Sequence, residues 1–298
     1  MVQRDALRLA RYEPKVAKML RTGKPPRING TIEEWPERLF VTIQETIKHG
    51  LRETLVFIDG QGALAYDDDN LYVAIRARDD SPMKNSAQNP TLLFKTGAAA
   101  EVPLGLDPKA DPKRTGARPG DIRLLFSVVK GKPVAVLYKP VDPTAPADQH
   151  ATFSSPVGQT QMDRVEVIAD ARVAVQQQPY KDGMFWVLEA AVPWKALGFE
   201  PPATGTLLRG DFGYLQSDQN GMQTVSRKYW SGKTQTVVCD IPSEARLAPA
   251  LWGEVVCVKG DPTLRIVAGA AEALDAGAPD KMLKSGGEDV DVNELLEE

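Results

Sequence analysis

The 298-residue chain has few of the residues that build metal centres and disulfide scaffolds. It contains two cysteines, Cys239 and Cys257, and two histidines, His49 and His150. Two cysteines cannot make a disulfide-dense scaffold, and either a single bridge or two reduced buried thiols fits their strand-like surroundings. Two histidines far apart in the sequence argue against a His-rich zinc or haem site.

The chain also lacks a strong charge of either sign and a long apolar run. Its 36 Lys+Arg and 40 Asp+Glu give a net charge of −4, which argues against a dedicated nucleic-acid binder. No apolar run approaches the roughly 20 residues of a transmembrane helix. The N-terminal segment MVQRDALRLARYEPK has no apolar core of a secretory signal. We therefore expect either a cytoplasmic protein or a mature or excised piece of a larger one.

Common catalytic motifs are missing as well. The sequence has no P-loop, no complete dinucleotide fingerprint around Gly60 and Gly62, and no HExxH, CxxC or GxSxG segment. A Ser-His-Asp triad would need His49 or His150, and no nucleophile motif lies near either one. The sequence therefore favours a binding or structural role over common enzyme chemistry.

The chain does have many turn residues and many short stretches with strand periodicity. Its 24 glycines and 23 prolines favour turns over long helices. Apolar and other residues alternate over 71–78 and over 122–129, and 134–138 follows the second stretch after a hairpin-like turn. Further strand candidates are 165–168, 184–192, 207–215, 226–230 and 251–258. This pattern predicts an all-β fold, an antiparallel sandwich of the jelly-roll kind.

Composition divides the chain into three parts. Residues 1–27 carry eight basic and two acidic side chains, with apolar residues at helical spacing, which predicts a basic N-terminal helix or a linker. Residues 28–258 form the predicted sandwich. Residues 259–298 are expected to hold a short helix over 264–274 and an acidic, solvated tail.

Two groups of residues stand out as candidate sites. Trp230 lies among polar residues next to a turn, where an exposed indole could stack on a sugar ring while Arg227 binds hydroxyls; packing in the core is the alternative. Asp67, Asp68 and Asp69 concentrate oxygen ligands in one turn, which suits calcium, although a capped and solvated turn explains them too.

Four segments, in order, resemble family-9 carbohydrate-binding modules and their DOMON-like relatives. Ile28–Trp35 resembles the opening I-(D/N)-G-x-x-x-x-W motif, and Ala65–Ala74 resembles the strand that follows it. Glu189–Gly198 is similar to the E-x-x-(I/V)-P-W-x-x-L-G segment, and Leu251–Val255 to the closing strand. The resemblance covers about residues 28–258 and implies a two-sheet jelly roll that binds sugar without catalysis. It also implies a structural calcium, an extracellular or periplasmic setting and attachment to polysaccharide-acting enzymes.

The resemblance also implies site residues. In such modules two aromatic rings can clamp a terminal sugar, and by position these are Trp230 and Phe94, the latter where better-known members have Trp. Glu101 and Arg123 correspond to the polar pair that binds hydroxyls. The usual D-x-(V/A)-E stretch begins with Ala98 here and ends at Glu101.

Three other functions remain open at this point. Some DOMON-like relatives carry b-type haem, for which Met83, His49 or His150 would have to serve as axial ligands. A structural or interaction module that has lost the sugar site would explain the changed stretch before Glu101. A glycoside hydrolase would need two carboxyl groups about 5–10 Å apart, which sequence spacing does not reveal.

Overall fold

The computed structural model describes residues 15–49, 54–156, 158–180, 183–232 and 241–260. All of them belong to the first of two compact units, Met1–Thr263, while the second unit, Leu264–Glu298, lies outside the described residues. The helix predicted over 264–274 and the acidic tail therefore remain predictions. None of the helices in the described ranges has the length and hydropathy needed to cross a membrane.

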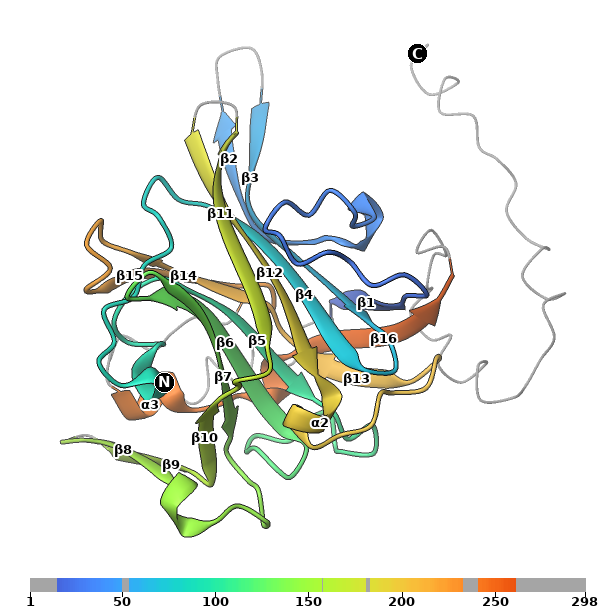
Figure 1. The fold of residues 1–298 in the computed structure, drawn as a ribbon, viewed down its shortest axis with the longest axis vertical. Helices are drawn as coiled ribbons and strands as arrows, with labels where there is room; N and C mark the ends of the chain where they lie inside the picture. The colour runs from blue at the N-terminus through green and yellow to red at the C-terminus, as the bar shows by residue number, and fades with distance from the viewer. Residues whose placement is uncertain (1–14, 50–53, 157, 181–182, 233–240, 261–298) are drawn as a thin grey trace, which may run out of the picture. The chain divides into compact units, whose positions relative to one another are not determined.

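Strands dominate the described residues (Figure 1). The first half of the chain contributes β1 (Val16–Arg21), β2 (Val41–His49), β3 (Thr54–Tyr66), β4 (Asn70–Arg78), β5 (Ala99–Gly105), β6 (Asp121–Val129) and β7 (Lys132–Lys139). The second half contributes β8 (Ala151–Ser155), β9 (Gly158–Met162), β10 (Arg164–Val167), β11 (Arg172–Tyr180), β12 (Gly183–Pro193), β13 (Leu207–Gly210), β14 (Gly213–Ser217), β15 (Thr224–Tyr229) and β16 (Gly253–Lys259). Short helical segments join them: α2 (Trp194–Leu197), α3 (Ile241–Ala245), η1 (Glu37–Leu39), η2 (Pro90–Leu92), η3 (Ala147–Gln149) and η4 (Pro249–Leu251).

Most of these strands form one curled sheet in the order β10-β7-β6-β5-β13-β16-β1-β3-β4-β12-β11. β14 continues from β13 along the same edge of β5 and also pairs with β15, and β2 pairs with β3. The curl brings the two halves of the sheet face to face, as the ring contact between Trp186 of β12 and Tyr214 of β14 shows, with centroids 6.2 Å apart. The main hydrophobic core lies between the two halves. The predicted all-β sandwich is confirmed.

Two features of the sheet differ from the prediction. The segment Val16–Arg21, predicted to be helical, is the strand β1, and it runs parallel to both β16 and β3. Its Ala17 and Met19 are buried with period 2, and pairing with two neighbours outweighs the weak helical pattern. The sheet is therefore mixed, although most pairs are antiparallel. Residues 1–14, the rest of the predicted helix, lie outside the described ranges.

A buried carboxylate joins the opening segment to β12. Glu189, 2% exposed, accepts hydrogen bonds from the backbone N–H groups of Asn29 and Gly30 at 3.0 and 2.6 Å and from the Trp35 indole at 2.7 Å. Gly30 has a φ of +82°, and a Cβ there would lie 2.9 Å from the Gln176 side chain. Hydrogen bonds therefore hold two of the segments that resemble the family, Ile28–Trp35 and Glu189–Gly198, against each other.

Candidate functional site

Trp230 lies in the core, not at the surface. Its side chain is 3% exposed and meets the Phe212 ring edge-on, with centroids 5.7 Å apart, above the space that Gly253 leaves open. The prediction of an exposed, sugar-stacking indole is wrong. The neighbouring polar residue that suggested exposure is itself buried: Ser231 donates from its N–H and its hydroxyl to Asp211 at 2.8 and 2.6 Å.

The structure brings Glu101 and Arg123 together. They lie on the adjacent strands β5 and β6, and the Arg123 guanidinium donates to Glu101 at 2.8 Å. Each is 1% exposed, and the buried Tyr229 hydroxyl donates to the same Glu101 oxygen at 3.2 Å. Burial alone would lower the pKa of Arg123, but the charge and hydrogen bond of Glu101, together with the nearby Tyr229 and Tyr138, outweigh burial and raise this pKa. The pair is intact but closed to solvent.

Phe94 and Arg227 lie next to this pair. The Phe94 ring has its centroid 5.0 Å from the Arg123 guanidinium and meets Tyr138 edge-on at 6.1 Å. Arg227 donates to the Phe94 carbonyl at 2.8 Å. Phe94 is fully buried, so it offers no open ring face to a sugar. Four of the five predicted ligand-binding residues therefore cluster, and Trp230 packs in the main core.

The short helix α3 lies against this cluster through its Glu244. Its Glu244, 4% exposed, pairs with Arg227 at 2.8 Å and with Lys95 at 3.1 Å. The Glu244 carbonyl accepts from Arg123 at 3.0 Å. We refer to the closed set of charged residues below α3 as the α3 chamber: Lys95, Glu101, Arg123, Arg227 and Glu244. No sequence pattern marked Glu244 as a candidate site residue, because a five-residue helix is too short to show a periodic pattern.

The aspartate turn between β3 and β4 is held by its own hydrogen bonds. Asp67 accepts from the N–H groups of Asp69 and Asn70 at 2.9 and 2.8 Å, and from the Tyr72 hydroxyl at 2.6 Å. Asp68 pairs with Arg21. Within the described ranges, no three His, Cys, Asp or Glu side chains form a group that could hold a metal. The contacts favour the capped turn, and calcium binding stays a prediction.

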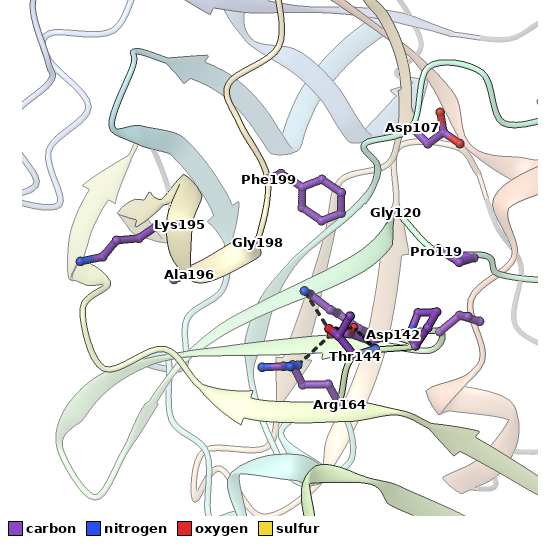
Figure 2. Close-up of a pocket in the computed structure, with 13 residues that line it drawn as sticks. Asp107, Pro119, Gly120, Asp142, Thr144, Arg164, Lys195, Ala196, Gly198 and Phe199 are labelled. Atoms are coloured by element: carbon purple, nitrogen blue, oxygen red, sulfur yellow. Dashed lines mark hydrogen bonds and ion pairs between the residues drawn. The ribbon is translucent and has the colours of Figure 1, made fainter. Parts of the chain in front are cut away.

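An open hollow lies beside α2, and its lining includes one aromatic ring (Figure 2). It has a volume of about 430 Å³. The half-buried Phe199 follows α2, Asp142 lies in the loop after β7, and Arg164 is at the start of β10. Lys139, at the end of β7, has its Nζ 5.5 Å from the centroid of the Phe199 ring. We refer to this hollow as the Phe199 hollow. The sequence did not predict this hollow, because its lining residues come from separate segments that share no motif.

Asp142 organises the polar side of the Phe199 hollow. It accepts from Arg164 at 2.9 Å and from the Thr144 hydroxyl at 2.7 Å, and it pairs with Lys139 at 3.3 Å. Partial burial would raise its pKa, but the Thr144 hydrogen bonds and the Lys139 charge outweigh burial and hold the pKa at about 2. The carboxylate therefore stays ionised at neutral pH. The arrangement presents fixed donors and acceptors next to an aromatic ring.

A second hollow of about 510 Å³ adjoins the first and shares Lys195 and Phe199 with it. Asp68 and Asp69 of the aspartate turn and Asp170 give it an acidic lining. Lys195 is exposed and reaches Asp170 at 3.8 Å. Polar groups therefore lie on both sides of Phe199.

The chain is similar to solved structures of carbohydrate binding module family 9. One, from Caldicellulosiruptor kristjanssonii in complex with cellotriose, is matched with a TM-score of 0.44 and 15% identity over 85% of this chain and 99% of that chain. Another from the same organism, in complex with glucose, is matched with a TM-score of 0.42 and 13% identity over 84% and 100%. No protein-family model matches the chain. No curated protein matches it.

The solved structures therefore belong to the family that the four sequence segments resemble. Because both TM-scores are below 0.5 and both identities below 25%, what those structures bind does not by itself indicate what this chain binds.

The haem ligands considered from the sequence do not share a site among the described side chains. Met83 is 4% exposed and packs in the main core, whereas His150 is exposed at the end of η3. The side chain of His49 lies outside the described ones. The structure thus supplies no observation that favours the haem alternative.

Proposed function

We propose that the chain is a non-catalytic glycan-binding module whose ligand lies in the Phe199 hollow. The observation that carries the proposal is the half-buried Phe199 ring beside the fixed cluster of Lys139, Asp142 and Arg164 (Figure 2). The C–H face of a pyranose packs on an aromatic ring, while its hydroxyls need donors and acceptors in fixed positions. The hollow supplies both.

The charge state of Asp142 supports binding rather than hydrolysis. A general acid must hold a proton at the working pH, which requires a raised pKa. The pKa of Asp142 is lowered to about 2, so this carboxylate accepts hydrogen bonds and does not donate a proton at neutral pH. Asp107, the second acid that lines the hollow, uses its carboxylate to cap its own turn by accepting from the Lys109 N–H at 2.9 Å.

Isothermal titration of the full chain against a panel of neutral oligosaccharides tests the proposal. Binding in the micromolar to millimolar range is expected, with Phe199→Ala weakening it by about tenfold or more through loss of the ring face. Phe40→Ala is the matched control, because Phe40 is also half-buried and lies against Trp35, not beside the hollow. If no glycan binds at millimolar concentration, the proposal is wrong.

A structural or interaction module remains the second candidate. The burial of Trp230 and the closure of the α3 chamber favour it, because both remove the binding surface implied by the resemblance. The two candidates differ in the titration, since an interaction module would bind none of the sugars. The extracellular or periplasmic setting and a flanking polysaccharide-acting domain belong to the glycan-binding proposal and depend on it.

A further inference from the structure

A third hollow lies on the outer face of the part of the sheet formed by β3, β4, β12 and β11 (Figure 1). The pairing register places Gln61, Arg76 and Val187 side by side on β3, β4 and β12. Trp186 and Leu188, on either side of Val187 in the chain, belong to the main core, so this row points away from the core. We refer to the hollow over this row as the Gln61 hollow, and its lining also includes Thr31, Ile32, Gln178 and Phe185.

The Gln61 hollow is small. Its volume is about 130 Å³, whereas pockets that enclose a whole drug-sized ligand have roughly 300–1,000 Å³. It shares no lining residue with the Phe199 hollow. A space of this size suits one substituent of a few heavy atoms, with the rest of the ligand outside.

One buried amide in the hollow has donors without a partner. Gln61 is 6% exposed, and its Oε1 accepts from Arg76 Nε at 2.6 Å and from Arg76 Nη2. Because a guanidinium only donates, these bonds fix the amide with its oxygen towards Arg76 and its Nε2 group on the other side. Within the described ranges Nε2 makes no hydrogen bond, and it remains accessible from outside. An acceptor from a ligand would therefore remove the cost of an unpaired donor.

The rest of the lining supplies an acceptor and an apolar wall. Gln178 Nε2 donates to the Gly30 carbonyl at 3.1 Å, which leaves Gln178 Oε1 as an acceptor. Ile32, Phe185 and Val187 contribute apolar surface. Donors, an acceptor and apolar surface in one small space match a secondary amide that ends in a methyl group, which has a carbonyl, an N–H and an apolar end.

The hollow favours a neutral ligand. Arg76 is the one charged residue among the described residues that line it, and Glu37 pairs with Arg76 at 2.8 Å. The Arg76 guanidinium also lies 5.4 Å from the centroid of the Phe40 ring. The charge and the orientation of Arg76 are therefore satisfied without a ligand, and no cation is left over for a carboxylate or a phosphate.

The backbone holds the Ile32 wall in place. Ile32 has a φ of +54°, a left-handed conformation that β-branched residues rarely adopt. The Trp35 N–H donates to the Ile32 carbonyl at 3.1 Å, and Glu189 binds the neighbouring Gly30 N–H. Such a conformation persists only where the surrounding structure imposes it. The wall is therefore formed before a ligand arrives.

We propose that the Gln61 hollow binds the acetamido group of an N-acetylated sugar. The ligand carbonyl accepts from Gln61 Nε2, the ligand N–H donates to Gln178 Oε1, and the ligand methyl packs on Val187. The sugar ring stays at the mouth of the hollow, beside the half-buried Thr31. This site is separate from the Phe199 hollow, and the proposal holds whether or not a glycan binds there.

An NMR titration of the full chain with methyl N-acetyl-β-D-glucosaminide tests the proposal. The side-chain amide signals of Gln61 and the methyl signals of Val187 should shift, with a Kd in the millimolar range. Methyl β-D-glucopyranoside, which has a hydroxyl in place of the acetamido group, should bind at these signals at least tenfold more weakly. Nε-acetyl-L-lysine, which has the acetamido group without the sugar ring, should also bind more weakly than the glucosaminide.

Gln61→Glu is the variant that removes the proposed donors. The new carboxylate keeps an oxygen for Arg76 and puts a second oxygen in the place of Nε2, so it should weaken glucosaminide binding at least tenfold. Gln159→Glu makes the same change of charge at an exposed residue of β9 and should leave the affinity unchanged. Phe199→Ala should keep the shifts at Gln61, which separates the two hollows.

Three results would overturn the proposal. Equal affinity for the two methyl glycosides at the Gln61 signals would show that the acetamido group is not recognised. Acetyl-lysine binding as tightly as the glucosaminide would contradict the assignment to a sugar. Shifts around Phe199 with none at Gln61 would leave the function proposed for the Phe199 hollow intact and remove this site. If Gln61→Glu does not fold, the affinities of the wild type for the three probes still decide the outcome.

Discussion

At the scale of the residue, two buried glutamates show how similar side chains serve different purposes. Glu189 is bound by neutral donors from the backbone and from Trp35. Glu101 is bound by the charged Arg123 and by Tyr229. The sequence marked both positions through the same resemblance. Only the contacts show that the first residue joins two segments of the fold and that the second belongs to a buried set of charged residues.

Replacing Glu189 should destabilise the fold strongly. Glu189→Gln removes the charge that four donors share, the fourth being the Thr31 N–H at 3.3 Å, and should lower the free energy of unfolding by about 2–4 kcal/mol. Glu254→Gln, which alters a partly exposed pair, should cost less than about 1 kcal/mol. Urea denaturation measures both, and equal losses would contradict the role assigned to Glu189.

The contribution of Asp142 should depend on pH. Its pKa is about 2 in the folded chain against 3.8 ordinarily, so its ion pairs stabilise the fold above pH 4 and lose that contribution as the pH falls towards 2. Because Asp142 lines an open hollow, the effect should be about 1 kcal/mol. Asp142→Asn should therefore be less stable than the wild type at pH 7, and the difference should disappear below pH 2. A pH-independent difference in urea denaturation would argue against this assignment.

At the scale of the element, the sequence predicted strands well where at least one paired neighbour is local along the chain. The stretches over 71–78, 122–129, 134–138 and 184–192 are β4, β6, β7 and β12 of the structure. β1 was predicted to be helical because its stability comes from parallel partners far along the chain. Neither β5 nor β11 was predicted: β5 is buried along its whole length, so it does not alternate, and β11 carries Gln176, Gln177 and Gln178.

The glycines of β3 allow the two halves of the sheet to approach. A Cβ on Gly60 or Gly62 would overlap the rings of Tyr214 and Phe212, respectively. The Gly60 and Gly62 pair, which matches no nucleotide-binding motif, therefore makes room for these two rings. Gly62→Ala should lower the free energy of unfolding by about 1–3 kcal/mol through overpacking. Gly158→Ala in β9, with open space around it, should change it by less than about 1 kcal/mol, and the reverse order would contradict the packing role.

At the scale of the whole molecule, the sequence could not predict which of the candidate site residues are buried. The resemblance read from the sequence predicted one site for Glu101, Arg123, Phe94 and Arg227. These four residues do lie near one another, because the sandwich fold brings their segments together. The sequence could not predict that α3 lies against them, or that Trp230 lies over Gly253, because these contacts join distant segments. It did not predict the Phe199 hollow for the same reason.

Burial in the sandwich should protect the Cys257 thiol from labelling by thiol reagents. This free thiol is 1% exposed, and burial raises its pKa to about 12, so it stays protonated at pH 8. In a Cys239→Ser variant, a thiol-specific reagent should label the chain only after denaturant opens the sandwich. Rapid labelling of the native variant at pH 8 would show that β16 is not buried between β1 and β13.

If the chain binds a glycan in the Phe199 hollow, the sugar contacts Phe199 and not Trp230. The most direct measurement is the map of amide and indole NMR shifts of the labelled full chain during titration with a bound oligosaccharide. Binding in the hollow should shift the signals of Gly198, Phe199 and Thr144, while the Trp230 indole signal should stay in place. Movement of the Trp230 indole, with no change around Phe199, would contradict it.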